Sequence, residues 1–146
     1  MRVVLQRASD VEVWIDGAVF SSTGKGLLLL YGTATGDTED ACQFLADKIV
    51  KMRIFEDDNG KMNRSVLDVD GEIMIVSQFT LCADTSKGRR PSFNSAMAPR
   101  VAESLYLQFV DMVKKSGLTV KTGSFGAQMD IKLTNNGPVT FVLENG

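Results

Sequence analysis

The chain has 146 residues, a length that suits one domain with a substantial core. Its hydrophobic content of 44% and charged content of 23% are those of a soluble globular protein, and no apolar run approaches the ~20 residues of a membrane span. The net charge of −2 gives no global signal for a nucleic-acid partner, and the absence of histidine excludes Ser-His-Asp and Cys-His nucleophiles and histidine metal ligands.

The N-terminal segment and the cysteines indicate a compartment. Arg7 stands where a signal peptide would need its apolar segment, so no export signal is predicted. Cys42 and Cys82 form neither a metal-binding spacing nor a disulfide framework. We therefore expect a cytoplasmic protein with free thiols and no membrane association.

The first elements in the chain are expected to be strands. Apolar or alternating runs span residues 2–8 and 11–16, and Asp16-Gly17 is a strong hairpin turn that leads into 18–23. A fully buried strand with flanking glycine follows at 25–33.

The hydrophobic period then changes to that of a helix. Residues 37–52 have helical apolar spacing, and Asp37, with Asp40 three residues later, resembles an N-terminal cap. Residues 53–63 predict a second hairpin that turns at Asn59-Gly60. After another turn, at Asp70-Gly71, a buried strand is expected from Glu72 to Phe79.

The second half of the chain contains a long loop, a second helix and further strands. The loop from Cys82 to Ala98 is long for a compact domain, and such loops are usually functional or disordered. A helix is expected to start at Pro99 and to end at Gly117. Its buried face is predicted to hold Val101, Leu105, Phe109, Met112 and Val113.

This order of elements predicts a single domain over residues 1–146 in the α/β class. Because most strands arrive as hairpins, we expect a largely antiparallel curved sheet or barrel-like β structure with two helices packed outside.

Two short stretches stand out as candidate sites. Ser77 to Leu81, SQFTL, places hydroxyl and amide groups where the most apolar strand enters the long loop. These groups either satisfy backbone atoms at a strand end or line a pocket in which free N–H groups stabilise an oxyanion. The basic loop DTSKGRRPSF, with Lys87, Arg89 and Arg90, is either a solvated loop or a phosphate-binding one.

The second stretch is NNGPVT, residues 135–140. Asn-Gly is a turn signal, and proline can open a strand at a sheet edge. The alternative is that Gly137-Pro138 holds two successive carbonyl oxygens in fixed directions, which would leave room for a hydrogen and collide with a larger group. The residues themselves do not choose between a cis and a trans peptide bond here.

Taken together, SQFTL and NNGPVT resemble the two signature motifs of the D-aminoacyl-tRNA deacylases. LQRAS, MRIFEDDNGKMN, DTSKGRRPSF and FGAQM are similar to segments of the same family in the same order, so the resemblance covers nearly the whole chain. It implies a homodimer, with active sites at the interface, that hydrolyses the ester of D-aminoacyl-tRNA and of glycine mischarged on tRNA. It implies neither a metal nor a cofactor.

The resemblance also assigns roles to residues. The catalytic positions are Ser77, Gln78, Phe79 and Thr80, where the backbone N–H groups of the last two would bind the oxyanion. Gly137 and Pro138, held by Arg7 and supplied by the partner subunit, would form a cis pair that rejects L-amino acids. The residues implied in binding adenosine or tRNA are Phe125, Gly126, Met129, Phe93, Arg89 and Arg90.

Two other hypotheses remain open from the residues. Thr80 would be a covalent nucleophile in one, although neither a histidine nor a nearby lysine is available to activate it. In the other, the protein is a non-catalytic RNA-binding module that uses the basic loop.

Overall fold

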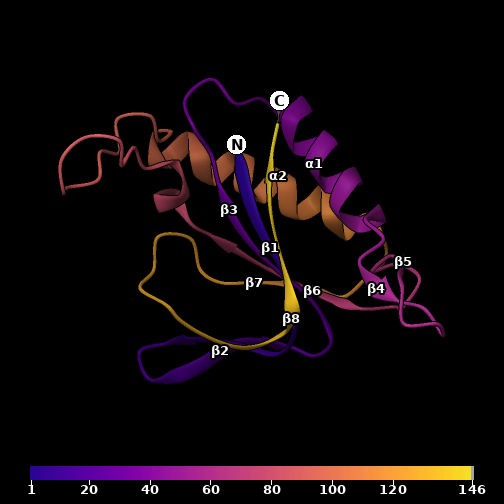
Figure 1. The fold of residues 1–146 in the computed structure, drawn as a ribbon. Coiled ribbons are helices and arrows are strands. Elements are labelled where there is room, and N and C mark those ends of the chain that lie inside the picture. Colours follow the sequence, from indigo (N-terminus) through magenta and orange to yellow (C-terminus); the bar gives the residue numbers. More distant parts are fainter. Residues whose placement is uncertain (146) are drawn as a thin grey trace.

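The structure is a computed structural model that describes residues 1–145. Its main unit is a six-stranded sheet in the order β2-β1-β3-β6-β7, with β8 paired to β1 (Figure 1). The strand bounds are β1 Arg2–Ile15, β2 Ala18–Thr23, β3 Gly26–Gly32, β6 Glu72–Ser77, β7 Val120–Thr122 and β8 Asp130–Glu144.

The length of β1 is what curves the sheet. Its first half pairs with β3 and its second half with β2, while β8 pairs with it from Arg2 to Trp14. Each pairing is antiparallel. Because β1 pairs with β3 and then β2 along one edge and with β8 along the other, the sheet twists into a nearly closed, barrel-like form. This confirms the barrel-like α/β architecture expected from the sequence.

Two strand pairs of the main sheet are parallel, so the sheet is mixed. β3 pairs with β6 and β6 with β7 in parallel. Parallel strands need a crossover connection, and each crossover contains one helix: α1 Glu39–Lys51 lies between β3 and β6, and α2 Pro99–Lys114 between β6 and β7. A small second sheet is the hairpin of β4 Phe55–Glu56 and β5 Met62–Arg64.

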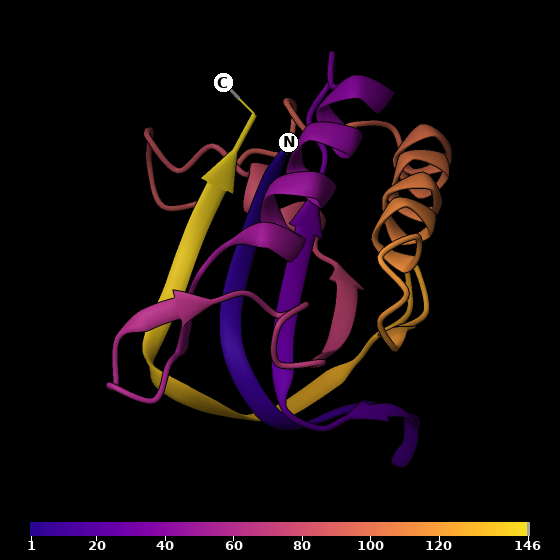
Figure 2. The same ribbon diagram turned by 90° about the vertical axis from the view of Figure 1, so that its right-hand side faces the viewer.

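The two faces of the sheet bury separate sets of apolar side chains. The helices lie side by side across one face (Figure 2), where the larger core joins them to β1, β3 and β6. The other face curls over a smaller cluster: Ala8, Val11, Val13, Leu28, Met74 and Val76, with Met129, Ile131 and Leu133 packed against it. This smaller cluster therefore supports the end of the connection between β7 and β8 and the first residues of β8.

The sequence patterns predicted both helices, but the predicted N-cap of α1 and one predicted core residue of α2 were wrong. The N-cap of α1 is Thr38, whose hydroxyl accepts the N–H of Ala41; Asp37 instead accepts the N–H of Ala34 and pairs with the N-terminal ammonium group. On α2, Val101 is 52% exposed, so it does not belong to the buried face with Leu105, Phe109 and Val113. Neither helix in residues 1–145 has the length and apolar character needed to cross a membrane.

Candidate active site

The end of β6 is the structural base of the candidate site. The strand is buried from Ile73 to Val76, and the N–H of Gln78 still donates to the carbonyl of Tyr31 on β3, at 2.7 Å. The chain then turns into a short 3-10 helix, η1, Phe79–Cys82. The strand expected to reach Phe79 therefore ends at Ser77.

The start of η1 presents backbone donors. Its hydrogen bonding begins with the N–H of Leu81, which donates to the carbonyl of Gln78 at 3.2 Å. Because 3-10 hydrogen bonds join residues three apart, the N–H groups of Phe79 and Thr80 precede the first bond of the helix. Two successive N–H groups at a helix start can stabilise negative charge that develops on a substrate oxygen.

The side chains of Gln78 and Thr80 are joined by a hydrogen bond. The Nε2 of Gln78 donates to the Oγ1 of Thr80 at 2.5 Å. A nucleophilic hydroxyl needs a base that takes its proton, and an amide N–H is a donor. The geometry therefore supports a positioning role for Thr80 rather than a nucleophilic one.

A pocket of about 460 Å³ opens beside this strand end, within the usual size of a small-ligand site. Six of the residues expected at the site line it: Ser77, Gln78, Phe79, Phe125, Gly126 and Met129. They come from the end of β6, the start of η1 and the connection between β7 and β8. The remaining wall was not predicted, and it is mostly apolar: Val76, Met97, Pro99, Ala102, Ala127 and Ile131. These side chains carry no distinctive chemistry, so no motif marks them; the nearest sequence signal was Pro99, which opens the helix after the long loop.

Tyr106 fixes one wall of the pocket. Its ring centroid lies 5.8 Å from that of Phe125, and its hydroxyl donates to the carbonyl of Ile75 at 2.7 Å. Burial raises the pKa of Tyr106 to about 12, so the hydroxyl keeps the proton that it donates. The aromatic wall is thereby tied to the same strand that carries Ser77.

Gly137 and Pro138 lie inside β8, where the chain forms a bulge rather than a turn between two strands. Gln6 pairs with Thr140 and Ala8 with Asn135, so Arg7 faces the extra residues of β8 between these pairs. The peptide bond between Gly137 and Pro138 is cis. Continuous pairing with β1 on both sides of the bulge overrides the Asn-Gly turn signal.

Arg7 holds this bulge in place. Its guanidinium donates to the carbonyl of Asn136 at 3.1 Å and to that of Ile54 at 2.9 Å. The amide of Asn135 closes the other side, donating to the carbonyls of Arg7 at 3.0 Å and Val139 at 3.2 Å. The segment is therefore fixed at both ends by hydrogen bonds to main-chain carbonyls.

The structure separates the bulge from the pocket. Within residues 1–145, Arg7, Gly137 and Pro138 are not among the residues that line the 460 Å³ pocket of the same chain. Gly137 and Pro138 are exposed. The two signature stretches thus occupy different places on one chain.

The long loop contributes the rim. Phe93 lies against Phe79, with ring centroids 5.2 Å apart. Arg89 and Arg90, a few residues earlier in the same loop, are exposed. The structure thus brings Phe93 to the pocket mouth and leaves the two arginines on the surface beyond it.

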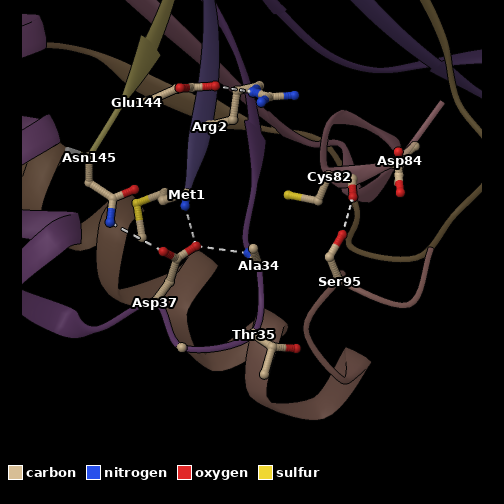
Figure 3. Close-up of a pocket in the computed structure, with 12 residues that line it drawn as sticks. Met1, Arg2, Ala34, Thr35, Asp37, Cys82, Asp84, Ser95, Glu144 and Asn145 are labelled. Carbon is tan, nitrogen blue, oxygen red and sulfur yellow. Dashed lines mark hydrogen bonds and ion pairs between the residues drawn. The ribbon is translucent and has the colours of Figure 1, made fainter. Parts of the chain in front are cut away.

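A larger, open hollow of about 610 Å³ lies near the chain ends (Figure 3). Most of its charged groups pair with one another, and Asp84 accepts the backbone N–H of Ser86 at 2.9 Å. The Asp37 carboxylate binds the N-terminal ammonium group, the Ala34 N–H and the Asn145 amide, and Arg2 pairs with Glu144. Burial alone would raise the pKa of Asp37, but these bonds bring it below its ordinary value. We interpret this hollow as a structural junction because its polar groups already have partners. No cluster of acidic residues or cysteines suited to a metal ion occurs in residues 1–145.

Comparison with known proteins identifies the family. The family model described as D-Tyr-tRNA(Tyr) deacylase matches residues 4–144. The D-aminoacyl-tRNA deacylase of Bacillus cytotoxicus is 50% identical over 99% of both chains. That of Protochlamydia amoebophila is 51% identical over 99% of this chain and 96% of its own.

Solved structures agree with this fold. The c-Myc DNA unwinding element binding protein has a TM-score of 0.94 at 38% identity and covers 100% of this chain and 99% of its own. A probable eukaryotic D-amino acid tRNA deacylase superposes with a TM-score of 0.85 at 19% identity, with 97% of each chain covered, which supports the fold alone. The chain belongs to the D-Tyr-tRNA(Tyr) deacylase family.

Proposed function

We propose that this protein hydrolyses the ester bond between a D-amino acid and the terminal adenosine of tRNA. The observation that carries the proposal is the pocket at the end of β6, which joins Ser77, Gln78 and Phe79 to Phe125, Gly126 and Met129. The D-aminoacyl-tRNA deacylases that are about half identical over the full chain support the same activity. Such an enzyme works where tRNAs are charged, which in most cells is the cytoplasm.

The reaction requires positioning more than acid–base chemistry from the protein. A water molecule attacks the ester carbonyl carbon, and the carbonyl oxygen becomes an oxyanion that the N–H groups of Phe79 and Thr80 stabilise. When the intermediate collapses, the ribose oxygen leaves with a proton and the amino acid is released. Because the chain contains no histidine, the neighbouring ribose hydroxyl is the group we expect to activate or position the water.

Choice of chirality is assigned to the carbonyls of Gly137 and Pro138. They would face the substrate Cα, where a D-residue presents hydrogen and an L-residue presents its side chain. Steric rejection of this kind selects by excluding the wrong substrate. Support comes from Arg7 and Asn135, whose hydrogen bonds fix the bulge on both sides.

The site is proposed to be completed by a second copy of the chain. Gly137 and Pro138 are exposed and do not line the pocket of their own chain, so a partner chain is the natural place for them to act. A two-fold homodimer would then carry two equivalent sites. Arg89 and Arg90 would contact the tRNA backbone from the rim.

The test of the activity is direct. Purified protein is added to D-Tyr-tRNA, and release of D-tyrosine is followed with time. Catalytic turnover supports the enzyme, whereas binding of tRNA without turnover would favour the RNA-binding module. A D-Tyr-tRNA sample without protein measures spontaneous hydrolysis of the ester.

A further inference from the structure

We propose that the exposed Phe79–Phe93 pair is a stacking platform for the unpaired base that precedes the terminal adenosine of tRNA. This inference rests on the proposed deacylase function and specifies how the substrate is held outside the pocket. The ligand is one nucleobase of the single-stranded 3′ end, read by stacking rather than by its hydrogen-bonding edge.

Both rings are exposed although they are large and apolar. Phe79 is 60% exposed and Phe93 41% exposed, and their centroids lie 5.2 Å apart at an interplanar angle of 57°. Contiguous exposed aromatic surface on a soluble protein often marks a binding site. Exposed aromatic rings are the surfaces on which single-stranded bases stack.

The pair extends outward from the active-site pocket. Phe79 lines the pocket, whereas Phe93 is not among the lining residues and its ring packs against that of Phe79. In Figure 1 the 82–98 loop, which carries Phe93, and the 123–129 connection, which supplies Phe125 and Met129, both extend to the left of the sheet in the view. If the terminal adenine of a tRNA enters the pocket, the base that precedes it would lie over this pair.

The backbone that carries Phe93 is held in place by hydrogen bonds. Asp84 and Ser92 close the neck of the loop with two reciprocal backbone hydrogen bonds of 2.8 and 2.9 Å. On the C-terminal side of Phe93, the N–H of Ala96 donates to the carbonyl of Phe93 at 3.0 Å. A ring on a fixed backbone loses less conformational freedom when a base stacks on it, which favours binding.

The charge of the loop matches a nucleic-acid strand. Lys87, Arg89 and Arg90 are all exposed between the neck residues. Asp84 is the one carboxylate in residues 84–93, and its oxygen already accepts the N–H of Ser86 at 2.9 Å. Although the whole chain has a net charge of −2, cations prevail here beside the aromatic pair, where phosphates would lie.

The experiment varies the substrate length. D-tyrosine is esterified to adenosine or to the trinucleotide CCA, and kcat/KM is measured on both for wild type, Phe93→Ala, Phe93→Trp and Phe44→Ala. Phe44 is 55% exposed on α1 and serves as a matched control far from the loop in sequence. The quantity compared is the ratio of kcat/KM on the trinucleotide ester to that on the adenosine ester.

We expect Phe93→Ala to lower this ratio by about 5- to 150-fold, the effect of losing one base–aromatic stack, mainly through a higher KM. Phe93→Trp should keep the ratio within a few fold of wild type, and Phe44→Ala should leave it unchanged. An unchanged ratio in Phe93→Ala would overturn the proposal. So would dissociation of a wild-type dimer by Phe93→Ala with equal losses on both substrates, which would make the pair a subunit contact.

Failure of the proposed function is distinguishable from failure of this inference. If the wild-type protein hydrolyses neither ester, the deacylase function fails. Binding of unesterified CCA, measured by calorimetry, then decides the platform separately. Weaker binding to Phe93→Ala than to wild type supports it, and equal binding or no binding refutes it.

Discussion

At the scale of single residues, the candidate chemistry depends on main-chain groups. The N–H groups of Phe79 and Thr80 begin η1, and the hydroxyl of Thr80 accepts a hydrogen bond from the Gln78 amide. Side-chain and backbone contributions of one residue can therefore be tested separately.

Thr80→Ala should retain substantial deacylation, because the backbone N–H survives the substitution. Thr80→Pro removes that N–H, and loss of one oxyanion donor typically lowers kcat by about 10²–10³. Single-turnover rates on D-Tyr-tRNA measure both variants. A loss beyond ~10⁴-fold in Thr80→Ala, with tRNA binding intact and an acyl-enzyme trapped in wild type, would establish a nucleophile instead, because a positioned base alone supplies ~10²–10⁴.

A second residue-scale prediction concerns pH and stability at Asp37. Its pKa is lowered in the folded protein, so its contribution to stability is present above its ordinary pKa of about 3.9 and is lost as pH falls through the lower folded value. We expect Asp37→Asn to lower the free energy of unfolding by about 1–3 kcal/mol at pH 7, since hydrogen bonds to a charged group are lost. Below about pH 3 the difference from wild type should shrink.

Urea denaturation at several pH values checks this, with Asp111→Asn as the control at an exposed aspartate. If Asp37→Asn and wild type differ by the same free energy at pH 7 and at pH 2, the carboxylate is not the stabilising group.

At the scale of elements, β8 determines where the second signature stretch lies. Arg7 donates to the carbonyls of Asn136 and Ile54, linking the bulge of β8 to β1 and to the chain just before β4. A lysine keeps the charge but lacks the fork of donors that reaches two carbonyls.

Arg7→Lys should therefore lower the free energy of unfolding by about 1–2 kcal/mol, the value of one or two hydrogen bonds. Because the bulge would be held less firmly, the rate on L-Tyr-tRNA relative to D-Tyr-tRNA should rise. Thermal denaturation and initial rates measure the two effects. Unchanged discrimination in a variant that is destabilised would limit Arg7 to a structural role.

The elements also show what sequence patterns can predict. Periodicity and turn residues located both helices and the hairpins at Asp16-Gly17 and Asn59-Gly60, because these signals are local. For the segment around Gly137 the residues left open a turn or a rigid Gly-Pro pair, and they did not predict a bulge, since its shape depends on pairing with β1, more than a hundred residues earlier. The early end of β6 was missed because Phe79 is apolar and follows the strand closely, although its ring is exposed beside the pocket rather than buried in a strand.

For the candidate site, the resemblance of short motifs found the polar strand end and the aromatic wall. It did not find the apolar wall from Met97, Pro99 and Ala102, because these residues carry no chemistry that a motif would mark. Tyr106 was missed because its role, supporting Phe125 from α2, is visible only once the helix is packed on the sheet.

At the scale of the whole molecule, the pocket and the bulge lie apart on one chain, so the account requires two chains. Mixing an inactive Gln78→Ala protein with an inactive Pro138→Ala protein should restore part of the activity. In a hybrid dimer, one site receives both intact components. Refolding the two proteins together and assaying D-Tyr-tRNA hydrolysis tests this. Absence of complementation, with hybrid dimers demonstrated, would count against a shared site.

The central claim is that the main-chain carbonyls of Gly137 and Pro138 admit a substrate only when a hydrogen occupies one position on its Cα. Initial rates on four substrates at one enzyme concentration test it most directly: D-Tyr-tRNA, D-Asp-tRNA, Gly-tRNA and L-Tyr-tRNA. Glycine has hydrogen at both positions, so a steric filter cannot exclude it, and the D-side chain should matter little because it points away. The account predicts hydrolysis of the first three substrates and none of L-Tyr-tRNA. Rapid hydrolysis of D-Tyr-tRNA with inert Gly-tRNA, at concentrations where both bind, would contradict it and would require a positive contact to the D-side chain.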